Sequence, residues 1–388
     1  MCFRQFVIYI SLLLFFSACR NNDRDTYRAV DDVQSNDYSS RFIIEQFEGY
    51  SKLTVKNPWQ GAKNRNYIYY IGKDKSLIPT DVPETNIIIS PVKSIVCTST
   101  THISMIDTLG GIEQISAVSG SSYVYNRKIR ERIYDEKVFD IGYENGYNTE
   151  LIYSIDPDVV LVYGVGSESV PVFSRLISMG IPVLYIADYL EQHPLARAEW
   201  IKVYGELLGK RELAENIFRA VRDEYITVVE TIENNRREPA KVMLGLPFKD
   251  SWFVSPGNSY IARLIEDAGG QYLWSDKNSD TSIPMSLEAV CRKALEADIW
   301  LNTGTATSLE DIRSVDNRLA ELPLISEGLV YNNNKRINSH GGNDYWESGA
   351  LNPHIILKDM ASIINPGLFP KHELFYYKRL KTLTDTLK

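Results

Sequence analysis

The sequence has few of the residues from which reactive or metal centres are built. Its 388 residues include four cysteines and five histidines, and no two histidines stand at the spacing of a metal site. The patterns of a phosphate-binding loop, a G-x-S-x-G nucleophile elbow and an H-E-x-x-H zinc site are absent. We therefore expect no catalytic residue, no metal site and no cofactor.

Positive charge and long apolar runs are also scarce. The net charge of −8 is opposite in sign to the basic face that nucleic acids require, so we expect no nucleic-acid partner. After the N-terminus, no stretch approaches the roughly 20 apolar residues that span a bilayer. An apolar content of 44 % and a charged content of 24 % are typical of a globular chain, and the length favours two lobes over one core.

The N-terminus departs from this composition. Arg4 precedes an apolar run over residues 6–16, and Ser17-Ala18-Cys19 follows it. A positive start, a short apolar core and small residues form the plan of a signal peptide.

A cysteine directly after the small residues resembles the lipoprotein signal, in which that cysteine is lipidated. We expect residues 1–18 to be a signal peptide, Cys19 to be lipidated and the polar residues 19–40 to form a flexible tether. This arrangement would hold the protein in the periplasm, anchored to a membrane by its lipid. An ordinary secretory peptide with an incidental cysteine is the alternative.

A succession of helix, acidic turn and strand occurs twice in the chain. It is seen in "GYNTELIYSIDPDVVLVYG" (146–164) and again in "LEAVCRKALEADIWLNTG" (287–304). Earlier in each half, an apolar strand leads into a helix that ends at Gly-Gly, the expected left-handed stop. The pattern predicts one α/β lobe built twice, with parallel sheets. We place the N-terminal lobe at residues 91–209 and the C-terminal lobe at residues 237–388.

Two further segments complete the predicted organisation. From Leu213 the apolar positions keep a helical stripe over about six turns, which predicts a long, rigid inter-lobe helix over residues 210–236. Gly209 would separate this helix from a preceding one. Residues 41–90 alternate as strands do, and we expect them to form an extra β segment packed on the first lobe.

The predicted strand exits are the candidate ligand site. Ligands bind outside the carboxyl ends of the strands in open α/β sheets, and two facing lobes would place those ends along one cleft. The loops there are rich in aromatic and hydroxyl side chains, which suit a flat or bulky ligand. The residues that we expect to contact the ligand are Thr100, Tyr123, Tyr143, Tyr163, Arg197, Trp252, Asp344, Tyr345 and Trp346.

From about Pro91 to Pro370, the chain resembles the solute-binding proteins of ABC importers for vitamin B12, ferric siderophores and haem, and its N-terminus resembles that of Bacteroides-type lipoproteins. The order and spacing of several motifs carry the resemblance. They are "PVKSIVCTSTTHISMIDTLGG", "NTELIYSIDPDVVLVYG", "SMGIPVLYI", "VSPGNSYIARLIEDAGG" and "LEADIWLNTG". The resemblance implies the helical-backbone periplasmic-binding fold, with two α/β lobes, a long joining helix and a cleft that closes modestly.

The resemblance also implies partners. It predicts a monomer that delivers a metal chelate to an ABC permease and its ATPase. One exposed glutamate on each lobe would dock onto permease arginines, and by motif these are Glu150 and Glu266.

The charge of the predicted cleft bears on the ligand. Arg127, Lys128, Lys249 and Arg197 are balanced by Glu144, Asp250, Asp344 and Glu347. Such a balance fits a hydroxamate-type iron chelate or a cobalamin better than a triply charged catecholate, which would call for several arginines. Haem would need an axial tyrosine or histidine, for which Tyr123, Tyr163 and His340 are candidates.

We favour a siderophore-type iron chelate because such chelates form the larger part of the family. A corrinoid such as cobalamin is the alternative. A lipid-anchored scavenger of haem or another chelate, without a permease, is a further one. A hydrolase using His340, Asp344 and Glu347 for acid–base chemistry is the alternative from a different class.

Overall fold

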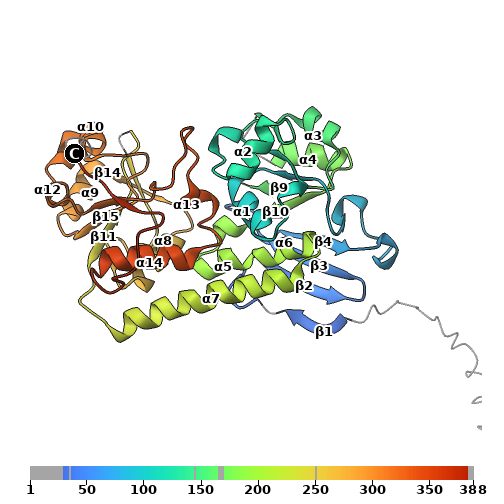
Figure 1. Ribbon diagram of the computed structural model, residues 1–388, viewed down its shortest axis with the longest axis horizontal. Helices are drawn as coiled ribbons and strands as arrows, with labels where there is room; N and C mark the ends of the chain where they lie inside the picture. Colours follow the sequence, from blue (N-terminus) through green and yellow to red (C-terminus); the bar gives the residue numbers. More distant parts are fainter. Residues whose placement is uncertain (1–28, 35, 144–145, 165–169, 250, 383–388) are drawn as a thin grey trace, which may run out of the picture.

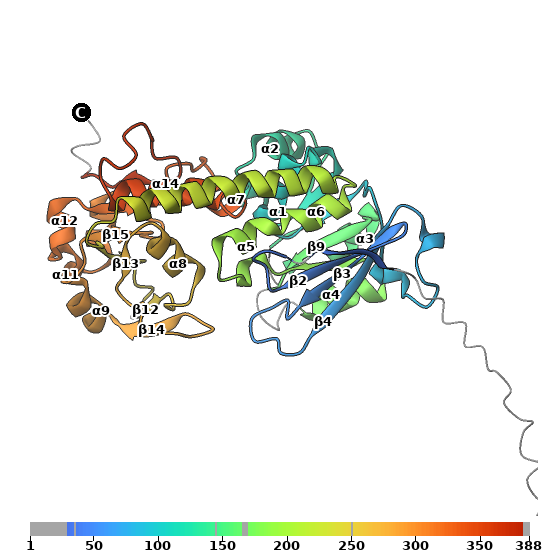
Figure 2. The same ribbon diagram turned by 90° about the horizontal axis from the view of Figure 1, so that it is seen from below.

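The computed structural model describes residues 29–34, 36–143, 146–164, 170–249 and 251–382. Two α/β lobes lie side by side, and the long helix α7 (Arg211–Asn234) runs along both of them (Figure 1). A further sheet packs beside the first lobe (Figure 2). The predicted α/β architecture is confirmed.

The first lobe is built on a five-stranded parallel sheet in the order β10-β9-β6-β7-β8. Its central strands are buried on both faces, which explains why they read as continuous apolar runs. The strands are β6 (Ile95–Cys97), β7 (Ile115–Val118), β8 (Phe139–Asp140), β9 (Val159–Tyr163) and β10 (Val183–Ile186). The helices are α1 (Thr100–Thr108), α2 (Arg127–Tyr134), α3 (Thr149–Ile155) and α4 (Val170–Ser178), with short 3-10 turns η3 (Ile112–Gln114), η4 (Ser121–Tyr123) and η7 (Asp188–Leu190).

Three helices connect the lobes: α5 (Pro194–Glu199), α6 (Ile201–Leu207) and α7. Gly209, with φ of +64°, separates α6 from α7 as the sequence predicts. The buried side of α7 follows the predicted helical stripe, with residues three or four apart. These residues are Ala214, Phe218, Val221, Tyr225, Val228 and Ile232. Because α7 packs against both α6 and α14 (Pro353–Ile364), it contacts elements on both sides of the molecule.

The second lobe repeats the alternation of strands and helices seen in the first lobe, but the strand at one edge of its sheet runs in the opposite direction. Its sheet has the order β13-β11-β15-β16-β17, and only β17 is antiparallel to its neighbour. The strands are β11 (Lys241–Leu244), β13 (Gln271–Tyr272), β15 (Ile299–Leu301), β16 (Val330–Asn332) and β17 (Lys378–Arg379), and a separate ribbon pairs β12 (Ser251–Val254) with β14 (Ile283–Ser286). The remaining helices are α8 (Tyr260–Asp267), α9 (Leu287–Ala294), α10 (Leu309–Val315), α11 (Asn317–Ala320), α12 (Pro323–Glu327) and α13 (Asp344–Glu347).

The extra β segment is a five-stranded sheet in the order β1 to β5. Strands β1 to β4 pair antiparallel, whereas β5 is parallel to β4. Its inward side chains, including Phe42, Ile44, Leu53 and Val55, join the core of the first lobe. The strands are β1 (Ala29–Gln34), β2 (Phe42–Phe47), β3 (Tyr50–Lys56), β4 (Asn66–Gly72) and β5 (Ile87–Ile89), with turns η1 (Lys75–Leu77) and η2 (Glu84–Asn86).

The predicted flexible tether over residues 19–40 extends too far. Residues 29–34 form β1, and the backbone N–H groups of Asp37, Tyr38 and Ser39 donate to the carboxylate of Glu199 at 2.9, 3.0 and 2.8 Å. Because the Glu199 side chain is fully buried on α5, it needs such donors in place of water. Residues 36–41 are therefore part of the folded protein, whereas the predicted signal peptide and Cys19 lie outside the described residues.

Within the described ranges, the structure contains no helix that is both long enough and apolar enough to cross a bilayer.

Candidate functional site

Residues from both lobes come together around Arg197 on α5. Its guanidinium lies 4.7 Å from the ring centroid of Tyr260, at the start of α8 in the second lobe. From the first lobe, Asp188 follows the exit of β10 and is buried. Burial raises the pKa of the Asp188 carboxyl, and the nearby Arg197 opposes that rise. Arg197 thus lies between the lobes, where the sequence predicts the ligand cleft.

Many buried polar atoms near the strand exits have no hydrogen-bond partner among the described residues. They belong to residues that follow β7, β10, β15 and β16, and to the helices beside them. The atoms are His102 Nδ1 and Nε2, Ser119 Oγ, Asp188 Oδ1, Arg197 Nε, Tyr204 OH, Thr303 Oγ1, Asn333 Nδ2 and Asn334 Oδ1. Since buried polar groups are normally paired, this region can accept polar atoms of a ligand or ordered water.

His102 is a buried polar side chain in this region that carries no charge. It is fully buried, and burial lowers its pKa to about 3, so the imidazole is neutral. Its ring centroid lies 6.3 Å from that of Tyr204, whose hydroxyl is also unpaired. A neutral imidazole beside a phenol can donate or accept hydrogen bonds, but it adds no charge to the site.

On the first lobe, Tyr123 and Tyr143 are exposed to 51 and 53 % and their ring centroids lie 5.2 Å apart. They flank Gly120, with φ of +61°, at which a Cβ would come within 3.0 Å of both rings. Only glycine therefore allows the two rings to approach here. Both tyrosines remain predicted ligand contacts in an accessible position.

The predictions for Thr100 and Tyr163 concern the same lobe. Thr100 is half-buried at the start of α1, directly after the exit of β6. Tyr163 ends β9, and its ring centroid lies 4.4 Å from that of Tyr189.

Trp252 has a different environment from the one that a ligand contact requires. It is fully buried, packs against Trp300 and donates its indole N–H to the Leu244 carbonyl at 3.1 Å. Its neighbour Phe253 points to the other side of β12 and is 51 % exposed, and Phe248 is more exposed still. The geometry gives the predicted role of Trp252 no support. Because side chains alternate between the two faces of a strand, Trp252 and Phe253 must point in opposite directions. The sequence does not show which of them faces inward.

Three consecutive predicted residues on α13 also differ in exposure. Asp344 is buried, and its Oδ2 accepts a hydrogen bond from Arg336 Nε at 2.5 Å. Tyr345 is buried beside Tyr376 and Tyr377. Trp346 is 57 % exposed, so it is the member of this trio whose side chain is most accessible to a ligand.

The loop before α13 and α13 itself contact the first lobe. Glu347 Oε2 accepts a hydrogen bond from the Tyr125 N–H at 2.7 Å, and Asn338 Nδ2 donates to the Val124 carbonyl at 2.8 Å. Burial raises the pKa of the Glu347 carboxyl to about 8, although the Tyr125 N–H opposes the rise. No local pattern in the sequence predicts this connection, because it pairs segments more than 200 residues apart.

The three residues considered for a hydrolase have separate partners. Glu347 is bonded to the Tyr125 backbone and Asp344 to Arg336, whereas His340 Nδ1 lies 3.0 Å from Arg130 Nη2. This arrangement provides no shared acid–base pair. Elsewhere too, no group of three or more His, Cys, Asp or Glu residues suited to a metal is found in the described part of the chain.

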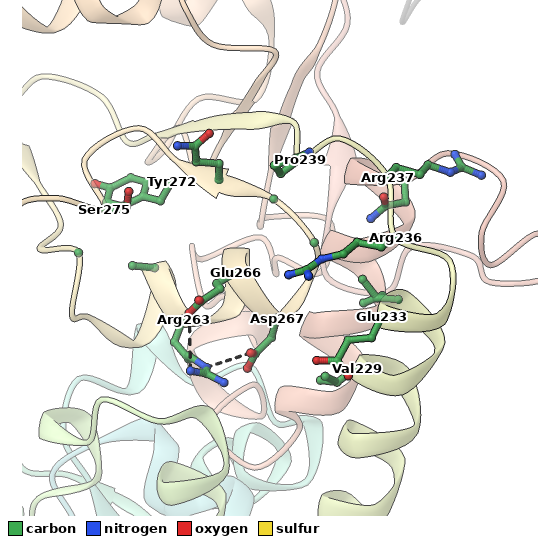
Figure 3. A pocket seen from close by; sticks show the side chains of 17 residues that line it. Val229, Glu233, Arg236, Arg237, Pro239, Arg263, Glu266, Asp267, Tyr272 and Ser275 are labelled. Atoms are coloured by element: carbon green, nitrogen blue, oxygen red, sulfur yellow. Dashed lines mark ion pairs between the residues drawn. The ribbon is translucent and has the colours of Figure 1, made fainter.

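The predicted docking residues Glu150 and Glu266 are both exposed. Glu150 is in the first turn of α3, which is capped by Asn148. Glu266 lies near the end of α8, on the rim of a cavity of about 490 Å³ that also receives Arg236 (Figure 3). Glu144 and Asp250, two acids of the predicted charge balance, lie outside the described residues.

The internal repeat identifies one further glutamate. Glu288 occupies the first turn of α9, directly after the capping residue Ser286 and Leu287, just as Glu150 follows Asn148 and Thr149. Glu288 is bonded to Arg318. Aligning the two repeats, which the sequence itself permits, would have shown this equivalence.

Two parallel-sheet lobes, a helix in contact with both, and polar and aromatic residues gathered between them define a solute-binding protein. The chain belongs to the periplasmic binding protein family, which matches residues 95–335. Members of this family bind solutes and are not enzymes, so the solute-binding prediction is confirmed over the enzyme alternative.

Similar proteins span several ligands. An uncharacterized lipoprotein of Methanocaldococcus jannaschii is 24 % identical over 305 residues, covering 76 % of this chain and 70 % of that protein. A possible iron-binding periplasmic solute-binding protein of Staphylococcus epidermidis has a TM-score of 0.55 at 15 % identity, covering 71 % of this chain and all of that one. A periplasmic haem-binding protein of Pseudomonas aeruginosa has a TM-score of 0.54 at 16 % identity, covering 71 and 94 %. At such low identity, the solved structures support the fold alone.

Proposed function

We propose that this protein is the lipid-anchored solute-binding component of an ABC importer, and that it binds a siderophore-type iron chelate for delivery to a permease. The observation that carries the proposal is the set of buried polar atoms near the strand exits, Arg197 Nε among them, that have no hydrogen-bond partner in the described part of the chain. Oxygen atoms of a chelate would accept hydrogen bonds from the guanidinium. The exposed Tyr123 and Tyr143 would pack against its apolar parts.

Among the described residues, the small number of charged side chains near Arg197 favours a chelate with little net charge. The buried Asp188 lies close to Arg197, so its carboxyl offsets part of the positive charge that Arg197 would offer to a ligand. A triply charged catecholate would meet one guanidinium and a neighbouring carboxyl. A hydroxamate-type complex needs fewer cations, whereas cobalamin remains the alternative and haem a further one.

Titration of the purified protein with a ferric trihydroxamate, a ferric catecholate, cobalamin and haem tests the proposal. We expect dissociation constants of about 1 µM or tighter for the trihydroxamate. Arg197→Ala should weaken this binding about tenfold or more, while Arg197→Lys should restore part of it because a lysine keeps the charge without the planar fork. Arg313→Ala, on α10, is the matched control. Binding of cobalamin alone would replace the ligand in the proposal, and binding of none of the four would defeat it.

Docking onto the permease forms the second part of the proposal. Glu150 supplies the first-lobe contact, and the family motif gives Glu266 for the second lobe, whereas the internal repeat points to Glu288. Replacing each of the three glutamates by lysine in turn distinguishes Glu266 from Glu288 as the docking residue of the second lobe. Uptake into cells should fall to background for Glu150→Lys and for the correct second-lobe variant, with ligand affinity intact. Loss of affinity in these variants would show that the residues belong to the ligand site instead.

Lipid anchoring at Cys19 is the third part. It rests on the N-terminal sequence and not on the described structure. Cys19→Ala should release the protein from the membrane fraction or leave an uncleaved precursor. Unchanged membrane association of the variant would contradict the anchor, and a scavenger role without a permease would be supported if the anchored protein were found on the outer cell surface.

A further inference from the structure

The connection between β3 and β4 lies against the strand exits of the first lobe. Trp59 in this loop, residues 57–65, has its ring centroid 5.6 Å from that of Tyr185 and 5.8 Å from that of Tyr67. At Gly164, directly after β9, an added Cβ would lie 3.5 Å from the Cβ of Trp59. Trp59 therefore covers the end of β9, next to the predicted ligand contact Tyr163.

The same loop reaches the second lobe. Gln60 donates a hydrogen bond from Nε2 to the carbonyl oxygen of Asp280 at 3.2 Å, just before β14. Its backbone also hydrogen-bonds with Tyr189 of the first lobe. Figure 2 shows the loop extending from β3 and β4 toward the β12–β14 ribbon. One short segment of the extra sheet thus contacts both lobes.

The hairpin that carries this loop is held at both of its ends. At the far end, next to the β2–β3 turn, Gln46 Nε2 and Ser51 Oγ donate hydrogen bonds of 3.1 and 2.9 Å to the carboxylate of Glu206, which is buried on α6. Lys56 pairs with Asn66 at the end of the ladder, so the loop begins from a fixed register. A hairpin attached to the connector in this way can hold its tip at a defined place between the lobes.

The accessible side chains of the loop suit the class of ligand proposed above. Trp59 is half-buried, so part of its ring is accessible. The ring pair Tyr163 and Tyr189 is adjacent, and the Tyr189 hydroxyl donates to the Gly164 carbonyl. Neighbouring aromatic faces of this kind can pack against the apolar body of a chelate.

We propose that the β3–β4 loop forms a third wall of the ligand cleft, in which Trp59 packs against the bound chelate and Gln60 ties the wall to the second lobe. This inference rests on the proposed function for its ligand. It assigns a role to the extra sheet, which lies before the residues that match the family. The wall would make release of the chelate slower and selection by size stricter than two lobes alone allow.

The first experiment measures binding and release of the ferric trihydroxamate, haem and cobalamin. In one variant, residues 57–65 are replaced by Asn-Gly, a two-residue turn that keeps Lys56 paired with Asn66. Trp59→Ala and Gln60→Ala are milder changes should the shortened hairpin fail to fold. We expect release of the bound chelate to become about tenfold faster in the shortened variant and in Trp59→Ala. Tyr153→Ala, an exposed tyrosine on α3, is the matched control.

The second experiment needs no ligand. Gln60→Cys and Asp280→Cys, in a Cys291→Ser background, are treated with a short bifunctional thiol reagent, with Gln60→Cys and Glu321→Cys as the control pair. Selective cross-linking of 60 to 280 supports the wall, whereas equal or no cross-linking overturns it. If the pair cross-links but no chelate binds, the proposed function fails and the wall stands. Binding with unchanged release in every loop variant would overturn the wall's role in retaining ligand.

Discussion

The two lobes share a strand–helix repeat but present different residues to the region between them. The first lobe offers exposed rings, with Tyr123 and Tyr143 in tilted contact at the exits of β7 and β8. In the second lobe the tryptophans Trp252 and Trp300 at the sheet are buried, and the strand exits offer polar atoms such as Thr303 Oγ1. The exposed rings described in this lobe lie apart from one another, on Phe248, Phe253 and Trp346. The repeated fold therefore fixes where a ligand can bind, while the side chains at each strand exit decide which ligand binds.

The largest expected difference concerns stability. Trp252→Ala should lower the free energy of unfolding by about 3–5 kcal/mol, because it leaves a large cavity beside Trp300 and an unpaired Leu244 carbonyl. Phe253→Ala, one residue along the same strand, should change it by less than about 0.5 kcal/mol apart from any ligand effect. Urea denaturation of both variants measures this contrast, and equal losses would show that the second lobe does not bury its aromatic residues as described.

An effect of similar size should depend on pH at the contact between the lobes. Because the pKa of Glu347 is raised to about 8, its contribution to stability is fully present below its ordinary pKa and is lost as the pH rises through 8. The neighbouring acids Asp344 and Asp107 add to the rise, and they are bonded to Arg336 and Lys128. We expect a loss of about 4 kcal/mol between pH 5 and pH 9, because roughly three pH units separate pH 5 from the raised pKa and each is worth about 1.4 kcal/mol.

The variant Glu347→Gln isolates this effect. A glutamine can still accept the Tyr125 N–H but does not ionise, so its stability should vary less with pH than that of the unsubstituted protein. Glu321→Gln, an exposed glutamate of the same lobe, is the control. Thermal melts at several pH values provide the measurement. Parallel pH profiles for the protein and Glu347→Gln would contradict the assignment.

The smallest expected effect tests the exposed rings. Tyr123→Ala or Tyr143→Ala should leave the melting temperature nearly unchanged, because both side chains are about half exposed. Each should weaken binding of the chelate by about 1 kcal/mol, the worth of one aromatic contact. Isothermal titration with the ligand found in the panel measures this loss. A lowered stability with unaltered affinity would assign these rings to packing instead.

Much of the fold follows from the sequence alone. Gly110 and Gly269, both with positive φ, end α1 and α8 as the Gly-Gly pairs predict. The apolar spacing from Leu213 likewise predicts α7. These features depend on local backbone preferences and periodicity, which a single sequence displays directly.

The features that the sequence does not disclose depend on contacts between distant residues. Segment 36–41 is polar and reads as a tether, but it is ordered by Glu199 about 160 positions away. The strand pattern of β12 separates Trp252 from Phe253 without fixing which one is buried. The loop that carries Trp59 likewise has no marker of its contact with Asp280. Arg197 was identified because it falls in a segment beside the expected cleft.

The attachment of segment 36–41 to Glu199 has a mechanical consequence. Directly after β1, the chain is bound to the connector, the part that both lobes share, because the buried carboxylate of Glu199 accepts three of its backbone hydrogen bonds. Tension applied from the N-terminal side would therefore be borne by β1 and then by the connector, and it would not pull one lobe away from the other. The two lobes can therefore move relative to one another without straining the point at which segment 36–41 is attached.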